Sequence, residues 1–183
     1  MQKQQWDELG YPNVKMSINI SGKRVTSKGF INEIRELLSE TKVNCVEIQL
    51  EVTETALMED LDASMKVLNE VKDMKIKIAL DDFGTGYSSL TYLKKLPIDV
   101  VKLDREFIRN ISKIGEDQVI VEYAINLIHR LKMEIVAEGI ETKEQLEFLK
   151  KNNCDYGQGY LFSKPISREE FEKLLSSKQT FDY

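Results

Sequence analysis

Short apolar runs along the chain alternate with longer segments in which apolar residues recur every three or four positions. The run at 75–82, KIKIALDD, has the β-branched and alternating residues that are typical of a strand. The segment at 61–74 instead places Leu61, Met65 and Leu68 on one side of a helix. The same reasoning predicts strands at 15–20, 45–52, 75–82, 99–104, 134–139 and 154–162, and helices at 29–40, 61–74, 88–96, 117–133, 143–151 and 171–175.

The alternation of strands and helices predicts an α/β domain with a parallel sheet. Each strand returns to the sheet through a helix, which requires right-handed crossovers. Capping-box pairs, Thr142 with Gln145 and Ser167 with Glu170, mark the starts of the last two helices. Since the sequence contains no linker or low-complexity segment, we expect residues 1–183 to form one domain.

Polar side chains gather at the predicted carboxyl ends of the strands. In a parallel α/β barrel these ends share one rim, where active sites form. A doubly wound sheet would spread them along a line instead, so the pattern favours a barrel. The residues concerned are Asn19, Glu51, Glu54, Asp81, Asp82, Lys102, Asp104, Glu138, Glu141 and Gln158.

Composition and charge narrow the function classes. The formal net charge is −5, with 42% apolar and 31% charged residues and no long basic run, which argues against a non-specific nucleic-acid or membrane surface. No apolar run approaches the roughly 20 residues of a membrane span, and the polar first ten residues cannot serve as a signal peptide. Cys45 and Cys154 are expected to be reduced thiols, so we predict a cytoplasmic protein.

The ligand types at the strand ends favour hard cations. Carboxylate and amide oxygens suit Mg²⁺ or Mn²⁺, whereas the only histidine, His129, lies within a predicted helix and is expected to be structural or solvated. Carboxylates gathered without cations would raise one another's pKa values, and Lys102 offsets only one charge. The sequence therefore predicts metal at this rim.

A glycine-containing loop follows the third predicted strand. Its letters DFG match a protein-kinase motif, but no HRD-type or nucleotide loop accompanies them, and a lone GTG is weak evidence for a phosphate cradle. Gly84 and Gly86 instead allow backbone freedom, which suits a loop that closes over a ligand. The predicted mobile loop comprises Phe83, Gly84, Thr85, Gly86, Tyr87, Ser88 and Ser89.

Six motifs in order resemble the EAL-domain family of cyclic di-GMP phosphodiesterases, some members of which bind the dinucleotide without cleaving it. They are SINISGKRV, EVTET, LDDFGTGYSSL, VKLDREFI, AEGIET and GQGYLFSKP, and the resemblance runs from about residue 3 to about residue 175. It implies a TIM-type barrel, a site of two Mg²⁺ or Mn²⁺ ions, and hydrolysis of cyclic di-GMP to the linear dinucleotide pGpG.

The resemblance also assigns roles residue by residue. Lys102 matches the lysine that contacts the attacking water, Gln158 a glutamine that helps to hold water and metal, and Glu141 a second acid lining the site. Glu54 matches the acid that anchors the mobile loop. The metal-binding positions are matched by Asn19, Glu51, Asp81, Asp82 and Glu138.

One departure from the family is the absence of the Glu-Ala-Leu motif, whose glutamate is a metal ligand. The resemblance begins partway through the family's domain, so the first two strands, one helix and most of a second are missing. About six of the eight barrel strands remain. The open strands of such a sheet are expected to pair with a second copy, which predicts a homodimer or higher self-association.

Three functions remain open. The first is a metal-dependent cyclic di-GMP phosphodiesterase, and the second is a catalytically weak or inactive domain that acts as a cyclic di-GMP receptor or interaction module. The third is an unrelated barrel enzyme, such as a glycosidase with two carboxylates. The retained acids favour the first, whereas the missing glutamate favours the second.

Overall fold

The computed structural model describes residues 2–11, 13–84, 90–112 and 115–177. Six strands, β1 (Met16–Asn19), β2 (Ile48–Thr53), β3 (Lys77–Phe83), β4 (Val100–Leu103), β5 (Glu134–Ala137) and β6 (Tyr156–Gly157), are neighbours in the sheet in that order. The helices are α1 (Gln2–Glu8), α2 (Gly22–Val25), α3 (Phe30–Thr41), η1 (Cys45–Glu47), α4 (Glu54–Met58), α5 (Leu61–Asp73), α6 (Leu90–Leu93), α7 (Arg105–Ile108), α8 (Glu116–Arg130), α9 (Lys143–Lys151) and α10 (Arg168–Ser176). Sequential order and parallel pairing, as predicted, are those of a TIM-type fold.

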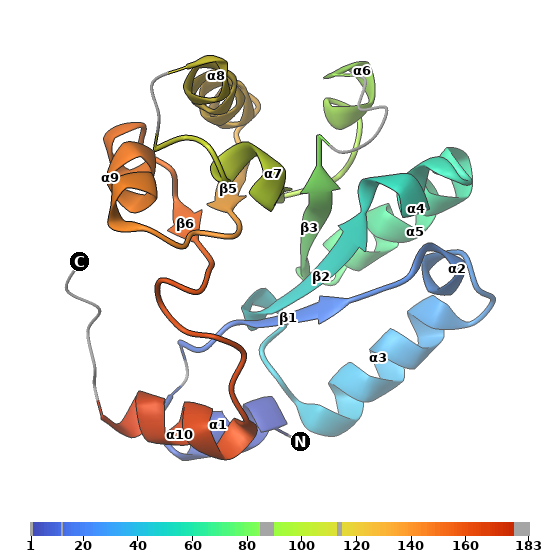
Figure 1. Cartoon of the computed structure of the whole chain (residues 1–183). Helices are drawn as coiled ribbons and strands as arrows, with labels where there is room; N and C mark the ends of the chain where they lie inside the picture. The colour runs from blue at the N-terminus through green and yellow to red at the C-terminus, as the bar shows by residue number, and fades with distance from the viewer. Residues whose placement is uncertain (1, 12, 85–89, 113–114, 178–183) are drawn as a thin grey trace. The chain divides into compact units, whose positions relative to one another are not determined.

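The chain divides into two compact units, residues 1–102 with 131–134 and residues 103–130 with 135–183. In the first unit, α5 packs on β3 and α3 packs beside α5 (Figure 1). Leu68 and Val71 of α5 are buried, as are Ile78 and Leu80 of β3. The apolar face predicted for the helix at 61–74 therefore does pack against the sheet.

In the second unit, α7 lies beside α8 (Figure 1). The inner face of α8 contributes buried residues to the core. Val121, Ile125 and Ile128 of α8 are fully buried. Both predicted capping boxes are present, at the starts of α9 and α10. At the second of them, hydrogen bonds from the Ser167 backbone and side chain hold the pKa of Glu170 below its ordinary value.

An aspartate fixes the amino end of a strand in each unit. Asp99 accepts a hydrogen bond from the backbone N–H of Ile78 at 2.9 Å and pairs with Lys72. Asp155 accepts one from the N–H of Ile135, also at 2.9 Å, and contacts His129 at 2.9 Å. His129 therefore contacts the aspartate that fixes the start of β5, which is a structural position.

The last predicted strand, 154–162, is wrong in its extent, because only Tyr156–Gly157 forms strand. The chain turns back after Gln158. The backbone N–H of Ile140 donates to the Gln158 carbonyl, and the backbone N–H of Leu161 donates to the Ile140 carbonyl. Gly159 is required here, since a Cβ would lie 2.1 Å from the Ile140 carbonyl oxygen. This close approach of two backbones ends the strand.

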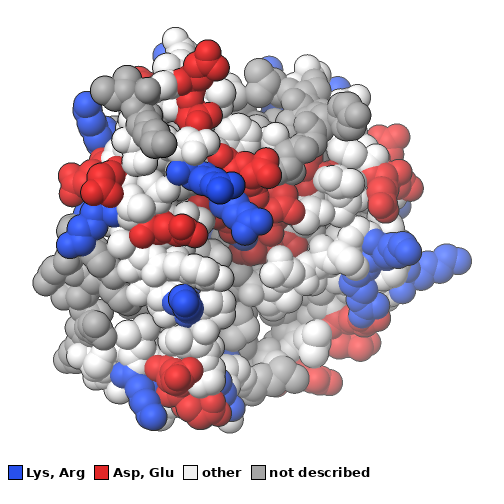
Figure 2. Space-filling view, in the orientation of Figure 1, with Lys and Arg blue, Asp and Glu red and all other residues white. Residues whose placement is uncertain are grey.

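Two surface features of the described residues are the distribution of charge and the character of the helices. On the face drawn in Figure 2, basic side chains are scattered among acidic ones over the described residues. In the same part of the chain, no helix combines the length and apolar character that crossing a bilayer demands.

Cys154 gives a chemical probe of the second unit. Burial, together with the nearby Asp155 carboxylate, raises the pKa of its thiol to about 11. In a Cys45→Ser variant, the rate of Cys154 alkylation in the native protein should therefore keep rising up to pH 11. Because the unfolded chain ionises first, stability should fall between the unfolded pKa, about 8.5, and the folded one.

The control for this prediction is the same alkylation in urea, where the rate should level off near the ordinary thiol pKa of about 8.5. A native profile that also levels off there would show that the partial burial of Cys154 does not raise its pKa.

Candidate active site at the carboxyl ends of the strands

A nearly buried charge cluster lies in the first unit. The Lys102 ammonium donates to Glu51 Oε2 at 2.8 Å and contacts Asp81 Oδ1 at 2.9 Å. The side chains of Lys102, Glu51 and Asp81 are only 7%, 8% and 14% exposed. Burying three charges is costly unless they are paired, so this arrangement indicates a site and not incidental surface chemistry.

Strand register explains why these residues meet. Glu51 is the direct neighbour of Asn19 on β1, and Thr53 is the neighbour of Asp81 on β3. Registered neighbours in a parallel sheet face the same side, and so do residues two apart on one strand. Asn19, Glu51 and Asp81 therefore share one face of the sheet.

The backbone at Asp82 departs from regular strand geometry. Its φ is +56°, a left-handed value that aspartate tolerates better than most residues. Its N–H donates to Asp81 Oδ1 at 3.2 Å, the oxygen that also contacts Lys102. In the described part of the chain both contacts fall on Oδ1, which leaves Asp81 Oδ2 for a further ligand.

The donor set fits a hard divalent cation. Two carboxylates face one ammonium, so the cluster carries one uncompensated negative charge with every group ionised. Asn19, exposed on the neighbouring strand, adds an amide oxygen. Oxygen donors with excess negative charge suit Mg²⁺ or Mn²⁺ better than zinc.

The predicted residues of the second unit also lie after the carboxyl ends of their strands, Glu138 and Gln158 directly and Glu141 four residues after Ala137. The backbone N–H of Glu138 donates to the Leu103 carbonyl at 3.1 Å, and the backbone N–H of Gln158 donates to the Ala137 carbonyl at 2.8 Å. Glu141 donates its N–H to Gln145 Oε1 at 2.8 Å. Each lies just beyond the carboxyl end of β5 or β6.

Glu141 borders a polar cavity of about 440 Å³ within the second unit. Arg105, which begins α7, and Arg109, which caps its carboxyl end, line it together with Thr142. Sequence reasoning missed these arginines, although their spacing of four on a helix that follows a strand end was a usable signal. The cavity offers cations, hydroxyl and carboxylate groups to a polar ligand.

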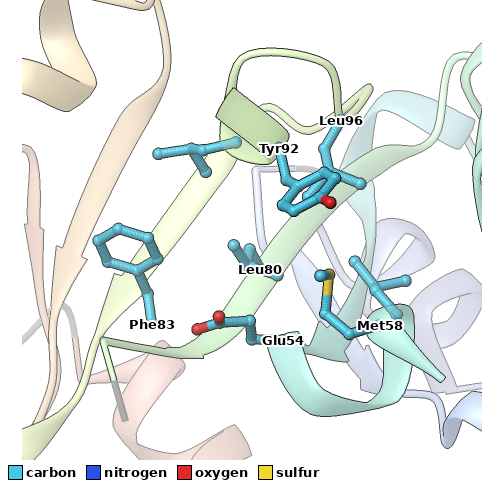
Figure 3. A pocket seen from close by; sticks show the side chains of 8 residues that line it. Glu54, Met58, Leu80, Phe83, Tyr92 and Leu96 are labelled. Atoms are coloured by element: carbon cyan, nitrogen blue, oxygen red, sulfur yellow. The ribbon is translucent and has the colours of Figure 1, made fainter. Parts of the chain in front are cut away.

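Glu54 lies elsewhere in the first unit, against an apolar pocket of about 20 Å³ (Figure 3). Leu80, Phe83 and Tyr92 also line this pocket, and Figure 3 shows the Glu54 carboxylate pointing toward the side where Phe83 lies. Glu54 begins α4 and is 6% exposed. Glu54 therefore lies beside Phe83, the residue at which the predicted loop begins.

The predicted mobile loop is described only in part. Phe83 ends β3 as a buried residue, and Gly84 follows in a turn with φ +96°. The remaining loop residues, Thr85, Gly86, Tyr87, Ser88 and Ser89, lie outside the described residues.

Comparison with known families decides the chain's membership. The model of the EAL domain matches residues 1–165. The chain belongs to the EAL-domain family. This membership confirms the resemblance seen in the motifs and removes the unrelated barrel enzyme as an alternative.

One similar protein bears the name of a cyclic di-GMP phosphodiesterase. The chain is 37% identical over 166 residues to the cyclic di-GMP phosphodiesterase NbdA of Pseudomonas aeruginosa, in a match that covers 91% of this chain and 21% of NbdA. The chain thus spans about a fifth of that relative.

Solved structures agree with the fold. The crystal structure of the EAL domain of Mycobacterium smegmatis DcpA matches with a TM-score of 0.92 and 32% identity, over 98% of this chain and 81% of that one. Klebsiella pneumoniae BlrP1, in a manganese and cyclic di-GMP complex, matches with a TM-score of 0.80 and 30% identity. That match covers 88% of this chain and 42% of BlrP1.

Proposed function

We propose that this EAL domain hydrolyses cyclic di-GMP to the linear dinucleotide pGpG in a reaction that depends on Mg²⁺ or Mn²⁺. The observation that carries the proposal is the buried Lys102–Glu51–Asp81 cluster at the carboxyl ends of parallel strands. Family membership supports the substrate, and the free thiols Cys45 and Cys154 agree with a cytoplasmic setting.

The donor chemistry supports a two-cation site held by Asn19, Glu51, Asp81, Asp82 and Glu138, of which Glu138 is assigned from the family motif alone. Two cations, when bound, acidify a water molecule and neutralise phosphate charge. Lys102 holds Glu51 and Asp81 in place, and its ammonium offsets the negative charge of an incoming phosphate. We assign Gln158 to water positioning and Glu141 to lining the site.

Glu54 is proposed to anchor the loop that contains Phe83 and Gly84. The support is local: Glu54 and Phe83 line one pocket, and both are buried. A carboxylate held at the start of α4 could fix the loop in one position and so couple loop state to catalysis.

One observation favours the receptor function instead. Residues 1–183 contain no Glu-Ala-Leu motif, so the metal ligand that this motif supplies in the family is not among them. If residues 1–183 act without that ligand, they would bind cyclic di-GMP and turn it over weakly or not at all.

The deciding experiment measures binding and turnover on the same preparation. Cyclic di-GMP affinity is obtained by titration calorimetry with Ca²⁺, and products are separated by anion exchange after incubation with Mg²⁺ or Mn²⁺. Conversion to pGpG supports the phosphodiesterase, whereas binding without product supports the receptor. Absence of both binding and product would overturn the proposal.

A further inference from the structure

Gln145 forms more hydrogen bonds than a helix cap requires. It lies in the first turn of α9 and is 4% exposed. Its side-chain Oε1 accepts from the backbone N–H groups of Glu141 at 2.8 Å and Thr142 at 3.0 Å. Its Nε2 donates to the backbone carbonyls of Ile108 at 3.1 Å and Arg109 at 3.3 Å. The side-chain amide therefore uses both of its donors and both of its acceptor positions.

The partners of this amide fix its orientation. Two N–H donors face Oε1 and two carbonyl acceptors face Nε2, so exchanging the two atoms would set donor against donor and acceptor against acceptor. Ile108 ends α7 and Arg109 caps it. The last carbonyls of a helix have no partner from the next turn of that helix. Gln145 thus ties the carboxyl end of α7 to the chain just before α9.

The capping box at α10 shows what capping alone needs. Either Glu or Gln can complete a capping box from the third helical position. At the start of α10 this residue is Glu170, which is exposed. A glutamate at 145 could make the two bonds that Oε1 of Gln145 makes, but an ionised carboxylate could not donate to the two carbonyls of α7. The contact with α7 therefore accounts for glutamine at this position, whereas capping does not.

A second contact holds the same two segments together. We call residues 138–142 the β5–α9 loop. Gly139 in this loop has a φ of +71°, and a Cβ there would lie 2.5 Å from the Cβ of Arg105, which begins α7. The loop therefore lies directly against the first residue of α7, while Gln145 joins it to the carboxyl end. Contacts at both ends of α7 restrict how far the loop can shift along the helix.

Glu141 is the residue of the β5–α9 loop that Gln145 holds most directly. Its backbone N–H donates to Gln145, and its exposed side chain borders the polar cavity that Arg105 also lines. A shift of the loop would carry the Glu141 carboxylate with it. Misplacing a group in an active site by about 1 Å can cost about 100-fold in rate.

We propose that Gln145 is a positioning residue, which acts through Glu141 by fixing the β5–α9 loop against α7. This inference rests on the proposed function, in which Glu141 lines the site that hydrolyses cyclic di-GMP. It adds one requirement that a capping box does not impose, namely that the side chain at position 145 donates hydrogen bonds to α7.

The test is Gln145→Glu, which keeps an acceptor for the N–H groups of Glu141 and Thr142 and removes both donors to α7. With Mn²⁺ and cyclic di-GMP, kcat per folded molecule should fall at least about tenfold, while KM should change by less than about twofold. Gln145→Met, which buries no charge, should lower kcat as well. The matched control is Glu170→Gln, the reverse exchange in the exposed capping box of α10, which should leave kcat unchanged.

A double-variant cycle tests whether Gln145 acts through Glu141. Glu141→Gln should lower kcat by itself, and adding Gln145→Glu to it should lower kcat no further. Losses that multiply in the double variant would show that Gln145 acts independently of Glu141, and they would overturn the assignment.

Amide hydrogen exchange measures the link without catalysis. In Gln145→Glu, the amides of Arg109 and Glu141, one on each side of the link, should exchange at least about tenfold faster. The Ile135 amide, which is bound to Asp155 in the same unit, should keep its rate. A wild type without turnover would overturn the proposed function and leave the exchange rates to decide whether Gln145 fixes the loop. Unchanged exchange at both amides, or an unchanged kcat where the wild type is active, would overturn the inference.

Discussion

Asp81→Asn should lower cyclic di-GMP turnover by at least about 100-fold while leaving the domain folded. The asparagine Oδ1 can still accept from Lys102 and from the Asp82 N–H, so the hydrogen bonds on Oδ1 survive. What disappears is the negative charge available to a cation at Oδ2. Loss of a charged metal ligand should cost at least as much as loss of its supporting partners, which is typically 10–100-fold.

Asp99→Asn is the matched control, because it makes the same chemical change at the amino end of the strands. Asp99 holds the Ile78 N–H and Lys72, so its substitution should reduce stability but leave turnover per folded molecule unchanged. Calorimetric titration with Mn²⁺ completes the comparison. Equal metal affinity in wild type and Asp81→Asn would refute the ligand role of Asp81.

Lys102→Met should destabilise the first unit by about 3 kcal/mol without metal, because it leaves Glu51 and Asp81 buried without their cation. Added Mg²⁺ or Mn²⁺ should recover much of this loss, since a divalent ion can replace the ammonium between the carboxylates. Denaturant unfolding with EDTA and with metal measures both effects. Activity should stay low in either condition.

Lys77→Met provides the comparison for this variant. Lys77 pairs with Glu134 in the same unit, but the two side chains are 31% and 36% exposed. Removing this pair should cost no more than about 1 kcal/mol, with no response to metal. If metal stabilised both variants equally, the recovery would be non-specific and the central role of Lys102 would be wrong.

The placement of polar residues at one edge of the sheet was predictable, because parallel strands all end at the same edge. Once strands alternate with helices, Glu51, Asp81 and Lys102 must lie at the same edge of the sheet. Their actual contacts were not predictable, because the 2.8 and 2.9 Å distances depend on strand register and side-chain rotamers. The sequence thus located the candidate site but not its ion-pair geometry.

Helix ends were less predictable than helix positions. Lys42, Lys75 and Lys132 adopt left-handed φ values of 51°, 65° and 63° just after helices, where glycine is the usual signal. The helix predicted to reach residue 133 accordingly ends at Arg130. All three lysines are exposed, and none is the glycine that would mark the helix end in the sequence.

The burial of Lys3 is a second feature that local patterns could not supply. It is 2% exposed and pairs with Asp7 and Glu47 at 2.5 Å. Burial alone would lower its pKa, but the bonds to these two acids outweigh that effect and raise the pKa above its ordinary value. Glu47 is 44 positions away along the chain, so sequence spacing gives no hint of the pairing.

Hydrolysis of cyclic di-GMP in ¹⁸O-labelled water tests the central claim most directly. With Mn²⁺, the protein should release linear pGpG whose new terminal phosphate carries one ¹⁸O atom, and EDTA should abolish the product. Mass spectrometry of the dinucleotide measures both the amount of product and its ¹⁸O content. A product formed equally well in EDTA, a product without the label, or no product above the Asp81→Asn background would contradict a metal-dependent phosphodiesterase centred on Glu51, Asp81 and Lys102.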